Sequence, residues 1–220
     1  MARKANRKQN VTSSSRAGTS RTATSRKGAA AMGEVRIIGG DWRGRKLPVL
    51  QSDGLRPTSD RVRETVYNWL QFEIAGANCL DVFSGSGALG FEALSRGAKS
   101  VTFLELSSQA AQQLKQNIGL LKIDNAQVVV GDSLQWLNQP ATESFDVIFL
   151  DPPFNQGLMQ AAVDKLFISG YVVSDEQQKQ IWLYLEQEKQ LDWPKLPEGW
   201  VCHREKSTSQ VRFGLFRFET

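Results

Sequence analysis

The stretch that decides the fold reads CLDVFSGSGALG from residue 79 to residue 90. Its apolar start, Cys79–Phe83, predicts a buried strand, and the glycine-rich turn that follows leads into a helix through Glu92–Arg96. Such a turn lets a ligand approach the backbone closely, at the carboxyl end of a strand where open α/β sheets bind ligands. Its three glycines also satisfy the dinucleotide pattern G-x-G-x-x-G, so the turn alone does not identify the cofactor.

Downstream of this turn, strands and helices alternate. The predicted strands are Val101–Leu104, Val128–Val130, Val147–Leu150 and Ile181–Leu185. A helix capped by Ser107 or Ser108 and another at Leu158–Phe167 lie between them, which predicts an α/β fold with a mostly parallel sheet covered on both faces. The last two apolar segments, Trp200–Glu205 and Val211–Phe218, leave no room for a helix between them. We therefore expect a C-terminal antiparallel hairpin at one sheet edge.

Two helices carry amphipathic patterns. One begins after Pro57, where Thr58-Ser59-Asp60 supplies capping residues, and Arg61 and Arg63 fall outside its apolar set. That set is Val62, Val66, Trp69 and Leu70. The helix that begins near residue 108 has an apolar face made of Ala110, Leu114, Ile118 and Leu121.

Positive charge is concentrated at the N-terminus. Residues 1–33 hold eight of the 27 Lys and Arg and no acid, so the remainder has 19 bases against 23 acids, a net charge of −4. With almost no large apolar side chains, residues 1–33 are predicted to be a disordered basic tail. The tail is interpreted either as an electrostatic tether to RNA or as a solubilising extension, with a mitochondrial transit peptide as a minor alternative.

Composition excludes several classes of protein. No apolar run approaches the roughly 20 residues of a membrane helix, and the N-terminal residues contain no apolar h-region of a secretory signal, so a cytoplasmic protein is expected. His203 is the single histidine, which argues against histidine catalysis and a multi-histidine metal site, so no metal is expected. The two cysteines, Cys79 and Cys202, are predicted to be reduced core residues.

Acidic residues follow two of the predicted strands. Glu105 is placed to accept the ribose hydroxyls of an adenosine, as in both NAD and S-adenosylmethionine sites, or to favour the start of the next helix. Asp132 could accept the adenine amino group beside the N–H of Ser133, or simply cap the helix at Leu134–Leu137. These two roles of Asp132 are compatible.

The motif Asp151-Pro152-Pro153-Phe154 follows the strand at Val147–Leu150. The exocyclic amine of a base is a poor nucleophile because its lone pair is delocalised into the ring. A carboxylate and the carbonyl of Pro152 can each accept one of its N–H groups, and two prolines fix the backbone so that both acceptors converge. Phe154 offers a face on which an extruded base can stack. The tetrad predicts methyl transfer to an amine and has no use in a dehydrogenase.

A basic hairpin is predicted between residues 34 and 58. Short apolar pieces separated by glycines suggest a strand pair, with Trp42 among its bases. We expect phosphate contacts from Arg36, Arg43, Arg45, Lys46, Arg56 and, in the following helix, Arg61. The alternative is an ordinary solvated hairpin. The predicted organisation is thus a tail at 1–33, a hairpin extension for RNA contact at 34–58 and a catalytic domain at 59–220.

Several motifs together carry a family resemblance. Asp-Pro-Pro-Phe looks like the catalytic motif of methyltransferases acting on the amino groups of adenine or guanine. With RIIGG at 36–40, GRKL at 44–47, LRPT at 55–58, DRVRE at 60–64, FSGSGALG at 83–90 and EALSRGA at 92–98, the chain resembles the bacterial 16S ribosomal RNA guanine-N2 methyltransferase family (RsmD-type). The resemblance covers residues 34–220 and excludes the tail.

The resemblance implies a Rossmann-like methyltransferase fold, S-adenosylmethionine as donor, and a single 16S guanine in the small ribosomal subunit as acceptor; we expect a monomer. The target amine is expected at Asp151, Pro152, Pro153 and Phe154. The cofactor is expected against Asp81, Phe83, Gly85, Ser86, Gly87, Glu105, Leu106, Asp132 and Ser133.

Three other functions stay open. A DNA adenine-N6 methyltransferase could use the same tetrad, although no target-recognition domain for duplex DNA is visible. A non-catalytic RNA-binding assembly factor would transfer no methyl group. An NAD-binding oxidoreductase would be distinguished by a cofactor titration.

Overall fold

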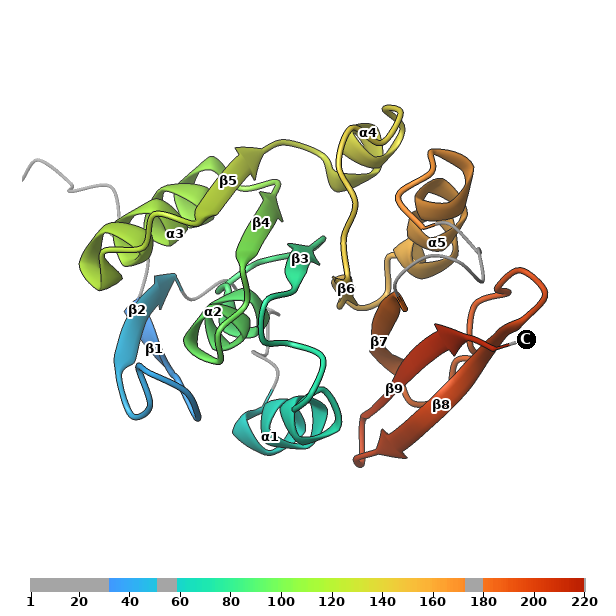
Figure 1. Cartoon of the computed structure of the whole chain (residues 1–220), viewed down its shortest axis with the longest axis horizontal. Helices are drawn as coiled ribbons and strands as arrows, with labels where there is room; N and C mark the ends of the chain where they lie inside the picture. Colours follow the sequence, from blue (N-terminus) through green and yellow to red (C-terminus); the bar gives the residue numbers. More distant parts are fainter. Residues whose placement is uncertain (1–31, 51–58, 173–179, 220) are drawn as a thin grey trace, which may run out of the picture.

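The computed structural model describes residues 32–50, 59–172 and 180–219, which form two sheets and five helices (Figure 1). The smaller sheet pairs β1 (Met32–Arg36) with β2 (Lys46–Leu50) in antiparallel register. The larger one has the order β5-β4-β3-β6-β7-β9-β8. Its strands are β3 (Asn78–Asp81), β4 (Ser100–Glu105), β5 (Ala126–Val130), β6 (Val147–Leu150), β7 (Trp182–Glu188), β8 (Trp200–Ser207) and β9 (Val211–Phe218).

The predicted mixture of parallel and antiparallel strands is confirmed. The strands from β5 to β7 pair in parallel, β9 pairs with β7 in antiparallel register, and β8 forms the edge. The chain proceeds from β3 to β4 and β5 on one side, then returns to β6 on the other side of β3. Strand order therefore reverses between β3 and β6, and a ligand crevice is expected beyond their carboxyl ends.

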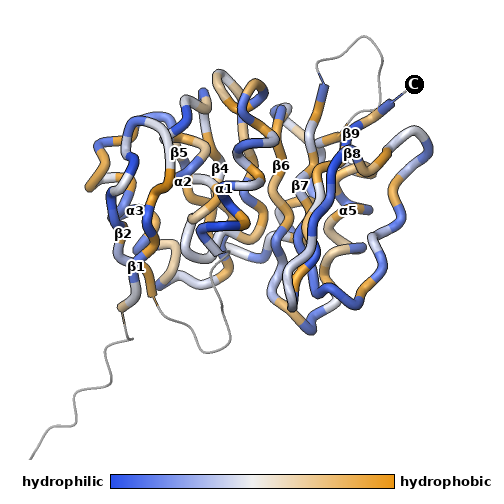
Figure 2. Tube along the Cα trace, turned by 90° about the horizontal axis from the view of Figure 1, so that it is seen from below, coloured by the Kyte–Doolittle hydropathy of each residue, from blue (hydrophilic) through white to orange (hydrophobic). Residues whose placement is uncertain are grey.

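Helices cover both faces of the large sheet. Successive strand residues point to opposite faces, so neighbouring residues of one strand pack against different helices. The helices are α1 (Asp60–Trp69), α2 (Ala88–Ser95), α3 (Ser108–Leu121), α4 (Ser133–Leu137) and α5 (Leu158–Ile168). Cys79 packs in a core with α1, α2 and α3, whereas its neighbour Leu80 packs with α4 and α5. The central strand β6 is hydrophobic along its whole length (Figure 2), whereas β7 ends in three buried or partly buried polar residues, Glu186, Gln187 and Glu188.

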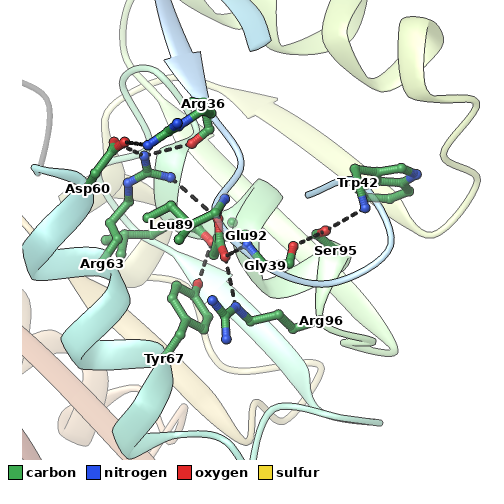
Figure 3. A network of polar contacts seen from close by, with 12 residues as sticks. Arg36, Gly39, Trp42, Asp60, Arg63, Tyr67, Leu89, Glu92, Ser95 and Arg96 are labelled. Atoms are coloured by element: carbon green, nitrogen blue, oxygen red, sulfur yellow. Dashed lines mark hydrogen bonds and ion pairs between the residues drawn. The ribbon is translucent and has the colours of Figure 1, made fainter. Parts of the chain in front are cut away.

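The two amphipathic helices lie where they were predicted, but some of their buried residues differ from the predicted apolar faces. Ser59 caps α1 and Ser107 caps α3, as expected. Arg63, predicted outside the apolar face of α1, is 1% exposed and lies in an ion-pair network (Figure 3). On α3 the buried face includes Ala111 and Asn117 in place of Ala110 and Ile118; the Asn117 amide donates to the carbonyl of Pro48 in β2.

Two further expectations are corrected. Cys79 is buried, but Cys202 is exposed because it lies in the edge strand β8; both are free thiols. β1 begins at Met32, so the last two residues of the predicted tail are part of a strand. Residues 1–31 of that tail lie outside the described residues.

Among residues 32–50, 59–172 and 180–219, no helix is long and apolar enough to cross a membrane. Within those same ranges, no cluster of three or more His, Cys, Asp or Glu could hold a metal ion.

Candidate active site

A cavity of about 370 Å³ lies at the carboxyl ends of the parallel strands, where strand order reverses. It brings together residues that follow β3, β4, β5 and β6. Its lining residues are Phe83, Gly85, Leu104, Glu105, Leu106, Ser107, Asp132, Ser133, Leu134, Asp151, Pro153, Gln156 and Leu158. Most of the predicted cofactor residues therefore share one cavity with two residues of the predicted catalytic tetrad.

The glycine turn divides into an open part and a packed part. Gly85 has a φ of 51°, and a Cβ there would meet only the Phe83 carbonyl at 4.0 Å, so the backbone is open to a ligand. A Cβ on Gly87, whose φ is 74°, would lie 2.6 Å from the side chain of Leu114. Gly87 is not among the residues that line the cavity and is needed for packing of the turn on α3. Its predicted cofactor contact, like that of Ser86, stays a prediction.

Glu105 fixes the turn to the end of β4. Its carboxylate accepts the N–H of Gly85 at 2.7 Å and the N–H of Ser107 at 2.7 Å. Burial raises the pKa of the Glu105 carboxyl, although these two hydrogen bonds act in the opposite direction. Each carboxylate oxygen has more than one acceptor site, so the group can still accept hydroxyls from the cavity.

Asp132 and Ser133 join the start of α4 to the same turn. The Asp132 carboxylate accepts the N–H of Gln135 at 2.9 Å, which confirms the predicted helix cap, and Asp132 also lines the cavity. The Ser133 hydroxyl donates to the carbonyl of Val82 at 2.6 Å. Leu106 lies at the cavity rim with its side chain 69% exposed.

The Asp-Pro-Pro-Phe corner leaves β6 and turns beside the cavity. Asp151 and Pro153 line the cavity, Pro152 is buried, and Phe154 is 39% exposed. Phe154 is therefore available at the surface next to the cavity wall. The following residue, Asn155, has a φ of 61°, and its N–H donates to the carboxylate of Glu188 at the end of β7 at 2.6 Å. This bond ties the chain after Phe154 to the neighbouring strand.

Two buried acids are absent from the cavity lining but interact electrostatically with the lining residue Asp151. Asp81 is 3% exposed, accepts the N–H of Gly90 at 3.1 Å and is not a lining residue, so its predicted cofactor contact also stays a prediction. Glu186 of β7 is 4% exposed and accepts the hydroxyl of Tyr184 at 2.5 Å. Burial first, and then the charge of Asp151, raise the pKa of Glu186 well above its usual value.

Sequence reasoning missed Glu186. Its one available signal was its position near the end of a strand, beside the strand that leads into the catalytic motif. Leu185 pairs with Leu150 in parallel register, so Glu186 is the next residue along β7 opposite Asp151. Acids at the ends of other strands were recognised because a glycine turn, a helix cap or the Pro-Pro-Phe sequence followed them.

The predicted phosphate-binding residues differ in their surroundings. Arg36 pairs with Asp60 at 3.1 Å and Lys46 pairs with Glu34 at 2.8 Å, both in exposed positions. Such surface ion pairs contribute only about 0–1 kcal/mol to the stability of the fold, so Arg36 and Lys46 can leave their acidic partners and bind phosphates. Trp42 is half-buried and packs partly against the core. Arg43, Arg45 and Arg61 are exposed, and Arg56 lies outside the described residues.

A mostly parallel sheet with a glycine turn and an Asp-Pro-Pro-Phe corner at its switch point defines a methyltransferase of the Rossmann-like class. The family described as conserved hypothetical protein 95 matches residues 35–217, and the chain belongs to it. Together with the relatives that follow, this match confirms the family resemblance drawn from the sequence.

Named relatives and a solved structure agree with this assignment. The ribosomal RNA small subunit methyltransferase D of Haemophilus influenzae is 50% identical, over 85% of this chain and 95% of that protein. The protein of the same name from Escherichia coli strain K12 is 46% identical, over 85% of this chain and 91% of that protein. The solved structure of Escherichia coli yhhF is 41% identical with a TM-score of 0.75, covering 86% of this chain and 99% of that one.

Proposed function

We propose that the chain transfers a methyl group from S-adenosylmethionine to the exocyclic N2 amine of a guanine in 16S ribosomal RNA, within a small-subunit particle. The observation that carries the proposal is the shared cavity, in which Asp151 and Pro153 face the same space as Gly85 and Glu105. The names of the relatives, which act on ribosomal RNA of the small subunit, support the substrate class. We further propose that the protein acts in the cytoplasm, because small ribosomal subunits are assembled in that compartment. We also propose that it acts as a monomer.

The cavity suits the charge and size of the donor. Its volume of about 370 Å³ lies within the roughly 300–1,000 Å³ of small-molecule sites. Glu105, Asp132 and Asp151 line it, and carboxylates attract a ligand that carries both a sulfonium and an ammonium group. In this proposal the open backbone at Gly85 faces the methionine end of the donor. The Glu105 carboxylate accepts hydrogen bonds from the ribose hydroxyls. The Asp132 carboxylate accepts a hydrogen bond from the adenine amine, beside the N–H of Ser133.

In the proposed mechanism the protein positions the amine for attack. When bound, the donor supplies a methyl group on a positively charged sulfur. The Asp151 carboxylate accepts one N–H of the base and the carbonyl of Pro152 accepts the other, which makes the nitrogen more tetrahedral. Phe154 stacks on the extruded base. The nitrogen must release a proton once the carbon–nitrogen bond has formed, and Asp151 is the group placed to take it.

The exposed bases of the hairpin give a prediction about RNA binding. The double variant Arg43→Gln, Arg45→Gln is expected to weaken RNA binding. A plot of the logarithm of the association constant against the logarithm of salt concentration should become less steep by about 1.5, because each lost phosphate contact removes about 0.7–0.9 from the magnitude of its negative slope. Filter binding over a salt series measures this slope. Lys99→Gln with Lys115→Gln removes two exposed charges elsewhere and should leave it unchanged. An unchanged slope in the hairpin variant would contradict the assignment.

Labelled methyl transfer tests the proposed function. Small-subunit particles from a strain that lacks the activity are incubated with the protein and labelled S-adenosylmethionine, and the label is mapped. We expect it on one guanine of 16S ribosomal RNA. Label on DNA adenine would favour the alternative methyltransferase, absence of transfer would favour an assembly factor, and tight binding of NAD would favour an oxidoreductase; each result overturns the proposal.

A further inference from the structure

Glu92 lies in the second turn of α2, is 0% exposed and is outside the cavity, yet it is the centre of a polar network (Figure 3). Its two carboxylate oxygens accept the N–H groups of Ile38 and Gly39, each at 2.8 Å. Arg96 also donates to the carboxylate at 2.8 Å, and Arg63 lies within 3.5 Å. A buried carboxylate on a helix thus binds the backbone that follows β1.

The contacts continue along the β1–β2 linker, residues 37–45. The Ser95 hydroxyl donates to the carbonyl of Gly39 and accepts the N–H of Trp42, while the Ser95 carbonyl accepts the N–H of Asp41. Gly40 has a φ of 74°, and a Cβ there would lie 1.8 Å from the Ser95 carbonyl oxygen. The linker therefore lies directly on the backbone of α2, with no room for a side chain between them.

Arg63 holds the other side of the same junction. Its guanidinium, 1% exposed, donates to the carbonyl of Arg36 at 2.8 Å and to the carboxylate of Asp60 at 2.7 Å. Its Nε and Nη1 have no hydrogen-bond partner within the described part of the chain, although Nη1 is in ion-pair range of Glu92. Buried ion pairs are costly to desolvate and add little net stability, so this network is better explained by the geometry that it imposes.

The network connects the two proposed binding surfaces. α2 starts immediately after Gly87 and the cofactor turn, and the N–H of Gly90 in its first turn is held by Asp81. On a later turn, Glu92 and Ser95 hold the linker that carries the exposed Arg43 and Arg45. The same short helix therefore contacts both the cofactor turn and the basic linker.

We propose that Glu92 is a positioning residue that sets the basic linker at a fixed place relative to the cofactor turn, so that RNA phosphates bound by Arg43 and Arg45 align the target base with the catalytic corner. This inference rests on the proposed function and assigns no chemical step to Glu92. An anion is required because the group accepts two backbone N–H groups and the Nε–H of Arg96, and also forms a buried ion pair with Arg63. A glutamine offers one acceptor oxygen in place of two and carries no charge.

The test is the variant Glu92→Gln, with KM for small-subunit particles, kcat and the Kd for S-adenosylmethionine measured together. We expect the KM for particles to rise roughly tenfold, equivalent to about 1.4 kcal/mol, with the cofactor Kd within about twofold of wild type. Glu64 is an exposed acid on α1. The matched control Glu64→Gln should change neither the KM for particles nor the Kd for S-adenosylmethionine. Removing one partner from a buried ion-pair network should lower the melting temperature in either case. If the melting temperature falls while the KM for particles stays unchanged, the role of Glu92 is merely structural and the inference is overturned.

Ser95→Ala provides a second test that leaves every charge in place. It removes the hydroxyl contacts to Gly39 and Trp42, so the KM for particles should rise in the same direction by a smaller factor. If Glu92→Gln does not fold, an unchanged KM in Ser95→Ala overturns the inference. If wild-type protein transfers no methyl group to RNA, the proposed function fails; if it does and these variants bind particles normally, the positioning role alone fails.

Discussion

The variant Asp151→Ala is expected to lose at least about 10³-fold in the rate of methyl transfer while its affinity for S-adenosylmethionine stays nearly unchanged. Asp151 lines the cavity and directly follows β6, beside two prolines that restrict its backbone. In the proposed mechanism its carboxylate touches the reacting amine and not the donor. The loss should therefore appear in the chemical step, measured as the single-turnover rate at saturating donor, with calorimetry reporting the donor Kd.

Two further variants sharpen this prediction. Asp151→Asn keeps the shape of the side chain and one acceptor oxygen but cannot take a proton, so it should be severely impaired as well. Asp124→Ala, an exposed acid in the turn before β5, should transfer methyl groups at the wild-type rate. A fully active Asp151→Ala protein would remove the catalytic role assigned to the corner.

Replacing Asp81 with asparagine is expected to stabilise the protein at pH 8 by up to roughly 4 kcal/mol and by almost nothing at pH 4. Burial, supported by the charges of Asp151 and Glu105, raises the pKa of Asp81 from 3.8 to about 7, although the N–H of Gly90 opposes the shift. The folded protein thus retains a proton that the unfolded chain releases. The contribution of protonated Asp81 to the free energy of unfolding is fully present below about pH 4 and is lost as the pH rises through 7.

Urea unfolding at pH 4, 5, 6, 7 and 8 measures this difference. The asparagine side chain can still accept the N–H of Gly90 but carries no charge, so the gap in unfolding free energy between variant and wild type should widen up to pH 7 and then level off. Asp124→Asn should show no such gap. Equal unfolding free energies for wild type and Asp81→Asn at pH 8 would contradict a buried, high-pKa Asp81.

Local sequence patterns predicted much of the fold because the elements follow hydrophobic periodicity. The strand at Val147–Leu150 has the predicted bounds, since four apolar residues are enclosed by polar ones. The α3 face was rotated by one residue, because Asn117 is buried through a hydrogen bond to the carbonyl of Pro48, about 70 residues earlier in the chain. Cys202 looked like a core residue because an apolar strand segment does not reveal that it forms a sheet edge.

The candidate site was predictable where it depends on strand ends. In a parallel sheet the residues after each strand meet at one edge, so Glu105, Asp132 and Asp151 were expected together and do share a cavity. The junction between Arg63, Glu92 and Gly39 could not be predicted in the same way. Its partners come from three elements far apart in sequence, and an arginine beside an apolar helix face normally points to solvent.

The most direct test of the central claim removes the amine itself. Small-subunit particles are reconstituted with 16S RNA that carries inosine at the guanine mapped by labelled transfer; inosine keeps the purine ring for stacking on Phe154 but lacks the N2 amine. We predict that these particles accept no methyl group, while particles with guanine at that position do. Transfer to the inosine particles at the guanine rate would contradict a corner built to grip that amine.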